Sequence, residues 1–214
     1  MNLMLHSRRN FHNSFNYKIR CGDYWFNLCI FKEINLEHEF LLSVDPSLRS
    51  SGWCIFNQKT KELKDFGIVK TDHLDESYEE ERLYRIADCL SSKGSHDTDL
   101  VIEGLSFMAK SAKRDVIDGM HWIIRTIYYV CYQETWIGVI PVTEWRNSIT
   151  TKEDRGYAKK NYDKKIYLKE VVVDMLPGDI LVKFDTYIKE NGYDHETLYD
   201  LTDAYFIGQY RMTL

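Results

Sequence analysis

The segment EFLLSVDPSLRSSGWCIF, residues 39–56, decides the fold. Its two apolar runs, LLSV and WCIF, are separated by polar turn-forming residues, a pattern typical of two antiparallel strands. Asp45 ends the first run, and Pro46 stops the strand there. The segment therefore predicts the first two strands of a sheet, with a carboxylate at the end of the first.

The regions that follow predict the rest of the sheet and its helices. The run ELKDFGIVK (62–70) completes an antiparallel meander, and Ser77 with Glu80 forms a capping box for a helix over 77–92. Two more strands are expected over 99–103 and 136–142. Further helices are expected over 116–132, after an N-cap at Thr143, and over 163–175, 180–190 and 198–211, with a basic loop over 150–161. This order predicts an α/β fold, a mixed five-stranded sheet of three antiparallel and then parallel strands, flanked by helices.

Four carboxylates form the candidate site. Asp45 and Glu103 each end an apolar strand, and Asp200 and Asp203 are three residues apart, on one face of a predicted helix. Clustered carboxylates raise each other's pKa unless a cation lies among them, and Mg²⁺ prefers oxygen ligands. Two ions roughly 4 Å apart can activate a water and stabilise a leaving oxygen of a phosphodiester. We expect one ion between Asp45 and Glu103, and the other between Asp45 and the later pair.

These acids also have structural alternatives, which explain Asp200 better than Asp203. An Asp–Pro pair such as Asp45–Pro46 often caps a turn. Glu103 could be a surface residue where a strand ends, and the helix dipole favours acids such as Asp200 in a first turn.

Length and composition limit the possible protein classes. The 214 residues suit one domain with appendages, and the 44% hydrophobic and 29% charged fractions are those of a globular chain. No apolar run approaches the roughly 20 residues of a membrane span, and no signal-peptide core is present. Five scattered cysteines predict reduced thiols and a cytoplasmic location. The net charge of −5 requires any nucleic-acid contact to be a local basic patch.

Residues 1–37 differ from the rest and are predicted to be an appended arm. They mix arginines and lysines with aromatic residues in no clear period. Three interpretations remain open, namely a basic segment that contacts nucleic acid, a short extra strand over 24–31, or an extension of little consequence.

The motifs VDPS…SGW, IEG and DLTDA resemble those of the RuvC family of Holliday junction resolvases, within the RNase H-like superfamily. The resemblance covers about residues 39–209, so residues 38–214 are expected to form the nuclease domain. It implies an endonuclease that nicks four-way DNA junctions symmetrically with two Mg²⁺ or Mn²⁺ ions. Asp45, Glu103, Asp200 and Asp203 then stand at the positions of catalytic metal ligands.

The resemblance implies further roles with weaker support. A basic residue facing the scissile phosphate corresponds to Lys165, with Lys164 as the alternative, and Phe107 is the candidate for the aromatic that reads the junction centre. The long loop over 150–161 departs from the bacterial enzymes and indicates a phage or organelle-type variant, for which host cytoplasm, an organelle or a virus factory are further locations. The basic residues expected to contact DNA, against the alternative of a solvated face, are Lys110, Lys113, Arg114, Arg146, Lys159, Lys160 and Lys164.

Two symmetric nicks imply a homodimer whose two-fold axis matches that of the junction. The helix over 116–132 is the expected interface, with core packing as its alternative. Its candidate contact residues are Ile123, Ile124, Ile127, Tyr128 and Tyr129.

Three rival functions stay open. Another RNase H-like nuclease, cutting branched DNA in general or processing RNA, would use the same chemistry. A DNA-binding module without catalysis would not need all four acids. An ATP-dependent relative of the actin and sugar-kinase group would need Gly-rich phosphate loops, for which the chain offers only SLRSSG.

Overall fold

The computed structural model describes residues 7–9, 15–21, 24–30, 38–74, 79–104, 114–133, 135–160 and 164–214. The chain divides into two compact units, Met1–Glu37 and His38–Leu214. Within the described residues, no helix has the length and apolar character needed to cross a membrane. Cys54, Cys89 and Cys131 carry free thiols.

The first unit is a three-stranded antiparallel sheet. It contains β1 (Ser7–Arg9), β2 (Phe15–Cys21) and β3 (Tyr24–Ile30), in the order β1-β2-β3. Only a single strand, over 24–31, was among the predictions for this region. The sequence did not reveal β2, whose basic and apolar residues give no clean period, although β2 pairs with β3 from Phe15–Ile30 to Cys21–Tyr24.

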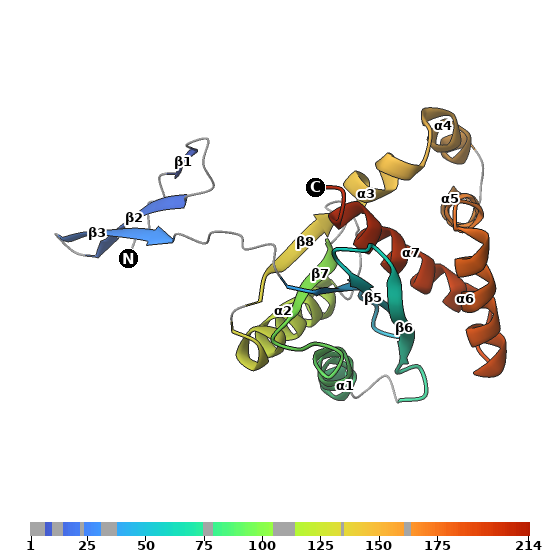
Figure 1. The fold of residues 1–214 in the computed structure, drawn as a ribbon, viewed down its shortest axis with the longest axis horizontal. Coiled ribbons are helices and arrows are strands. Elements are labelled where there is room, and N and C mark those ends of the chain that lie inside the picture. The colour runs from blue at the N-terminus through green and yellow to red at the C-terminus, as the bar shows by residue number, and fades with distance from the viewer. Residues whose placement is uncertain are drawn as a thin grey trace. The chain divides into compact units, whose positions relative to one another are not determined.

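The second unit contains the predicted mixed five-stranded sheet, in the order β6-β5-β4-β7-β8 (Figure 1). Strands β4 (Phe40–Asp45), β5 (Ser50–Asn57) and β6 (Leu63–Lys70) form an antiparallel meander. Strands β7 (Thr98–Gly104) and β8 (Ile137–Pro141) are parallel to β4. The predicted fold class is therefore confirmed.

Helices cover both faces of this sheet (Figure 1). One face packs against α1 (Glu79–Ser91) and α2 (Arg114–Cys131), through Leu42, Val44, Leu100 and Ile102 of the strands. The other face packs against α7 (Glu196–Arg211), with α3 (Val142–Ile149), α5 (Lys164–Asp174) and α6 (Gly178–Glu190) around it. Because residues alternate between the faces of a strand, Leu41, Ser43 and Asp45 belong to the α7 face.

Two expectations about the region after β8 are wrong. Most of the loop expected over 150–161 is helical, because Lys152–Lys160 form helix α4, whose first turn is capped by reciprocal hydrogen bonds between Thr151 and Asp154. Thr143 is not an N-cap, because α3 begins at Val142, directly after Pro141, so that Thr143 is already within its first turn.

Candidate active site

Asp45 and Glu103 lie side by side at the carboxyl edge of the sheet. The parallel pairing of β4 with β7 aligns Ser43 with Val101 and Val44 with Ile102, so Asp45 and Glu103 are the next pair along. Val101 packs in the core beneath α7, and Glu103, two residues later, shares its face. Both carboxyl groups therefore point to the α7 side of the sheet.

Helix α7 brings the second pair of acids to the same place. The Ser43 hydroxyl donates to the carbonyl oxygen of Ala204 at 2.8 Å, which ties α7 to β4. At Gly52, the partner of Asp45 across the β4–β5 ladder, a Cβ would lie 2.0 Å from the carbonyl oxygen of Asp200. Glycine is required there because any side chain would push the helix away from the strand. This close approach places Asp200 and Asp203 against the strand-end acids.

The carboxyl groups of Asp45 and Glu103 are close enough for each to affect the pKa of the other. Burial raises the pKa of Asp45 well above its usual value, and the charges of Glu103, Asp203 and Asp200 raise it further. Burial and then the charge of Asp203 raise the pKa of Glu103 to about 7. Ionised together, these acids oppose folding, and a cation among them would relieve the repulsion.

Asp200 and Asp203 have different surroundings. Asp203 is 6% exposed and accepts a hydrogen bond from Nη2 of Arg146 at 2.9 Å. Asp200 lines an open cavity, and burial raises its pKa to about 6 against the opposing effects of Ser50 and Lys169. The two acids of the DLTD segment thus face separate cations.

Arg146 and Trp145, from α3, complete the cluster. Arg146 Nη2 lies 4.0 Å from Glu103 Oε1 as well as 2.9 Å from Asp203 Oδ2, so its guanidinium lies between the two acids. Trp145 is fully buried and donates from Nε1 to Glu103 Oε1 at 2.9 Å, with the guanidinium of Arg146 4.7 Å from the centre of its ring. Arg146, which the sequence assigned to DNA contact, is therefore found among the carboxylates, and Trp145 was not predicted at all.

The donor chemistry of the cluster fits a hard divalent cation, since every acid offers carboxylate oxygens and three have raised pKa values. Among the residues that the structure describes, however, no three His, Cys, Asp or Glu side chains are already arranged as a metal-binding group. Arg146 holds Asp203 in this arrangement. An ion would have to draw the acids together.

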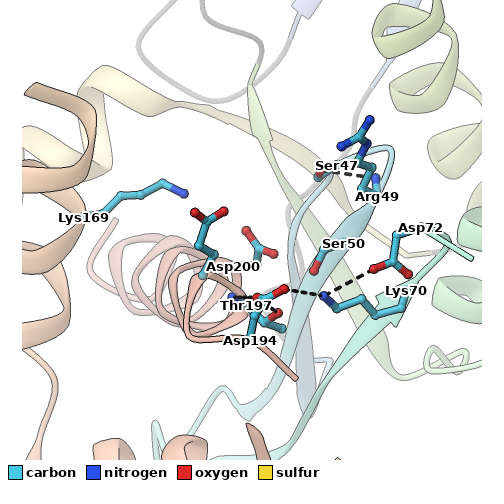
Figure 2. A pocket seen from close by; sticks show the side chains of 10 residues that line it. Ser47, Arg49, Ser50, Lys70, Asp72, Lys169, Asp194, Thr197 and Asp200 are labelled. Carbon is cyan, nitrogen blue, oxygen red and sulfur yellow. Dashed lines mark hydrogen bonds and ion pairs between the residues drawn. The ribbon is translucent and has the colours of Figure 1, made fainter. Parts of the chain in front are cut away.

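A polar cavity of about 290 Å³ adjoins Asp200 (Figure 2). Its basic residues are Arg49 from the β4–β5 turn, Lys70 at the end of β6, and Lys169 on α5. Arg49 and Lys70 were not among the predicted site residues. The position of Lys70 could have been predicted from the antiparallel meander. Lys70 pairs with Ser50 across β5 and β6, which places it at the same edge of the sheet as Asp45.

Most of the predicted DNA contacts lie where the structure gives no side-chain description. Phe107, Lys110 and Lys113 are outside the described residues. Helices α2, α4 and α5 include the others, but the structure does not describe their side chains, so their roles stay predictions; they are Arg114, Lys159, Lys160, Lys164 and Lys165.

Of the five α2 residues expected at an interface, Tyr129 alone is exposed, rather than half-buried or buried. Ile124 and Tyr128 are buried in the core, so they cannot contact a second subunit. Tyr129 is exposed, together with Trp122 and Val130, which the sequence analysis did not select. The guanidinium of Arg125 lies 4.2 Å from the centre of the Trp122 ring.

Comparison with solved structures identifies the architecture. Thermus thermophilus RuvC in complex with a Holliday junction substrate superposes with a TM-score of 0.50 at 12% identity, covering 81% of this chain and 94% of that one. A second Thermus thermophilus RuvC structure gives 0.48 at 12% identity, covering 81% and 96%. No protein-family model matches the sequence, and no curated protein matches it. The similarity shows a RuvC-like fold, a mixed five-stranded sheet flanked by helices.

Proposed function

We propose that this protein is a metal-dependent endodeoxyribonuclease that nicks four-way DNA junctions symmetrically. The observation that carries the proposal is the meeting of Asp45, Glu103, Asp200 and Asp203 at one edge of a RuvC-like sheet. A stable fold would not gather four carboxylates without a use for them, because their repulsion opposes folding. The RuvC structure that superposes with the chain was solved with a Holliday junction substrate.

The four acids would hold two divalent ions, Mg²⁺ or Mn²⁺. Asp45 would be the ligand shared by the two ions, because it interacts electrostatically with all three other acids. Bound ions of this kind supply an activated water and neutralise the leaving oxygen of a phosphodiester.

The chain's own residues prepare this site. Trp145 fixes one oxygen of Glu103 through its Nε1 hydrogen bond, and Arg146 offsets the charges of Glu103 and Asp203. Glu103, with a pKa of about 7, can hold or release a proton at its carboxyl group near neutral pH. Lys165 remains the predicted contact to the scissile phosphate.

A homodimer would let two such sites act on the two strands of one junction. The exposed face of α2 supports this arrangement, since Trp122, Tyr129 and Val130 are 65%, 58% and 65% exposed. Exposed aromatic residues beside an arginine are typical of the anchors of protein interfaces.

Cleavage of a synthetic mobile four-way junction in Mg²⁺ tests the proposal. We expect paired symmetric nicks from the wild type, and a loss of at least about a hundredfold in rate for Asp45→Asn and for Glu103→Gln. Thermal unfolding should show that both variants fold. Wild-type rates in both variants would sink the assignment of these acids.

Parallel substrates separate the rival functions. Equal cutting of replication forks, flaps and junctions would indicate a general branched-DNA nuclease, and a preference for RNA-containing substrates would indicate an RNA-processing relative. Tight junction binding with no cutting in either metal would indicate a DNA-binding module.

A further inference from the structure

The cavity beside Asp200 is a second feature of the carboxyl edge, and Asp200 is the acid that it shares with the carboxylate cluster. Four segments form its wall: the β4–β5 turn, the end of β6, helix α5 and the start of α7. At about 290 Å³ it lies at the lower end of the size range of small-molecule sites. It has room for one sugar–phosphate unit of a single strand and not for a duplex.

The cations of this cavity come from three separate elements. Lys169 points toward Asp200 in Figure 2, and its ammonium lies 4.7 Å from the centre of the Tyr199 ring. Lys70 lies between Asp72 and Asp194, at 3.8 and 3.7 Å. These distances exceed that of a hydrogen bond, so the ammonium can still donate to a closer acceptor. Arg49 is exposed to solvent on the turn that follows β4.

The hydroxyl groups and acids of the wall limit what can bind. Asp194 is occupied, because it accepts hydrogen bonds from both the backbone and the hydroxyl of Thr197. Ser50 Oγ is buried and, within the described parts of the chain, makes no hydrogen bond of normal geometry, although it is near enough to Asp200 to lower the pKa of that acid. It is a donor in place for an incoming oxygen.

Resting on the proposed nuclease function, we propose that this cavity binds the phosphodiester next to the scissile one on the cleaved strand. Arg49 and Lys169 are its charged contacts, and Ser50 is a neutral donor. The wall holds three cations, against four acids, Asp72, Asp194, Glu196 and Asp200. The phosphate is therefore bound only when a divalent ion neutralises Asp200, which links strand binding to the occupied active site.

The test measures DNA binding instead of cleavage. Full-length protein is titrated against a labelled four-way junction and a labelled single-stranded oligonucleotide, with Ca²⁺ present or with EDTA, from about 50 to 200 mM salt. The variants are Arg49→Ala, Lys169→Ala and the conservative Lys169→Arg. The matched control is Lys183→Ala, which removes a lysine of α6 that pairs with Asp179 and does not line the cavity. Denaturing gels verify that the probes stay intact.

We expect each alanine variant in Ca²⁺ to reduce the magnitude of the slope of log K against log salt by about 1, as one lost phosphate contact does. Over a fourfold rise in salt this is roughly a threefold smaller loss of affinity. Lys169→Arg and Lys183→Ala should keep the wild-type slope, and EDTA should remove the difference between variants.

Slopes equal to that of Lys183→Ala in both alanine variants would overturn the cavity assignment, while leaving junction cleavage by the wild type intact. If the junction is neither bound nor cut but the single strand shows the predicted loss, the cavity stands and the junction nuclease falls. A wild type that binds neither probe refutes both.

Discussion

Replacing Glu103 with glutamine should stabilise the metal-free protein at high pH, although Glu103 is a proposed catalytic residue. Glu103→Gln keeps an oxygen to accept the Trp145 Nε1 hydrogen bond and provides an amide that can donate to Asp45. What it removes is a charge that burial and Asp203 make unfavourable.

The pKa of Glu103 gives the size and sign of this effect. In the unfolded chain the pKa is near 4.5, and in the folded protein it is about 7. The native state therefore holds the proton longer, so the free energy of unfolding falls as pH rises from 4.5 to about 7. At 1.36 kcal/mol per pKa unit the loss is about 3 kcal/mol. The raised pKa values of Asp45 and Asp200 act in the same direction.

Urea unfolding in EDTA, followed by tryptophan fluorescence, measures this quantity. The wild type should lose at least the 2 to 3 kcal/mol, roughly, that Glu103 contributes between pH 5 and pH 8. Glu103→Gln should be more stable than the wild type by a similar amount at pH 8 and nearly equal to it at pH 4.5. Added Mg²⁺ should stabilise the wild type at pH 8 more than the variant, because it binds the native acids.

Glu62→Gln is the control. Glu62 is a surface acid whose pKa is lowered by hydrogen bonds from Lys64 and Thr60, so its neutralisation should give no gain at pH 8. The reasoning is refuted if wild-type stability is constant or rises from pH 5 to pH 8, or if Glu103→Gln is no more stable than the wild type at pH 8.

Three further predictions concern the packing, charge and assembly of the same unit. Gly52→Ala should destabilise the protein by about 3 kcal/mol in urea unfolding, because the added Cβ would meet the Asp200 backbone. Gly119→Ala, which has open space around it, should not destabilise the protein, and equal effects of the two changes would refute the Gly52 contact. Arg146→Met should bind Mg²⁺ at least about tenfold more tightly by calorimetry, because it removes a cation from between two carboxylates; unchanged or weaker binding would contradict this. Tyr129→Glu should convert a dimer to a monomer in light scattering, whereas Tyr84→Glu on α1 should leave the dimer intact. A dimer that survives Tyr129→Glu would exclude the exposed face of α2 as the dimer interface.

The local sequence pattern was sufficient to predict the five-stranded sheet and the position of the acids at the ends of its strands. The apolar runs predict β4 and β7, and strand periodicity alone places Asp45 and Glu103 at the ends of their strands. One local signal for helix α4 was present and was missed, because Thr151 and Asp154 form a capping box. The charged sequence of α4 has no apolar stripe, so the hydrophobic pattern did not indicate a helix.

Contacts between distant segments could not be predicted in this way. Arg146 pairs with Asp203, 57 residues away, and nothing in its local sequence separates it from a DNA-contacting arginine. The exposed side of α2 was also misjudged, because the helix carries apolar residues around much of its circumference. Only packing against the sheet shows that Tyr128 is core and Tyr129 is surface.

The two acids of strand β7 differ in how far the fold itself satisfies their charges. Asp99, near the start of the strand, is 2% exposed and accepts hydrogen bonds from His38, Gln58 and the backbone of Trp136 at 2.7 to 3.0 Å. These donors satisfy its charge with groups that the fold itself supplies. Glu103, four residues later, receives a hydrogen bond from Trp145 but faces the charges of neighbouring carboxylates. Under the proposed function, a divalent cation from outside the chain would complete the site around Glu103, which the fold alone leaves beside other carboxylates.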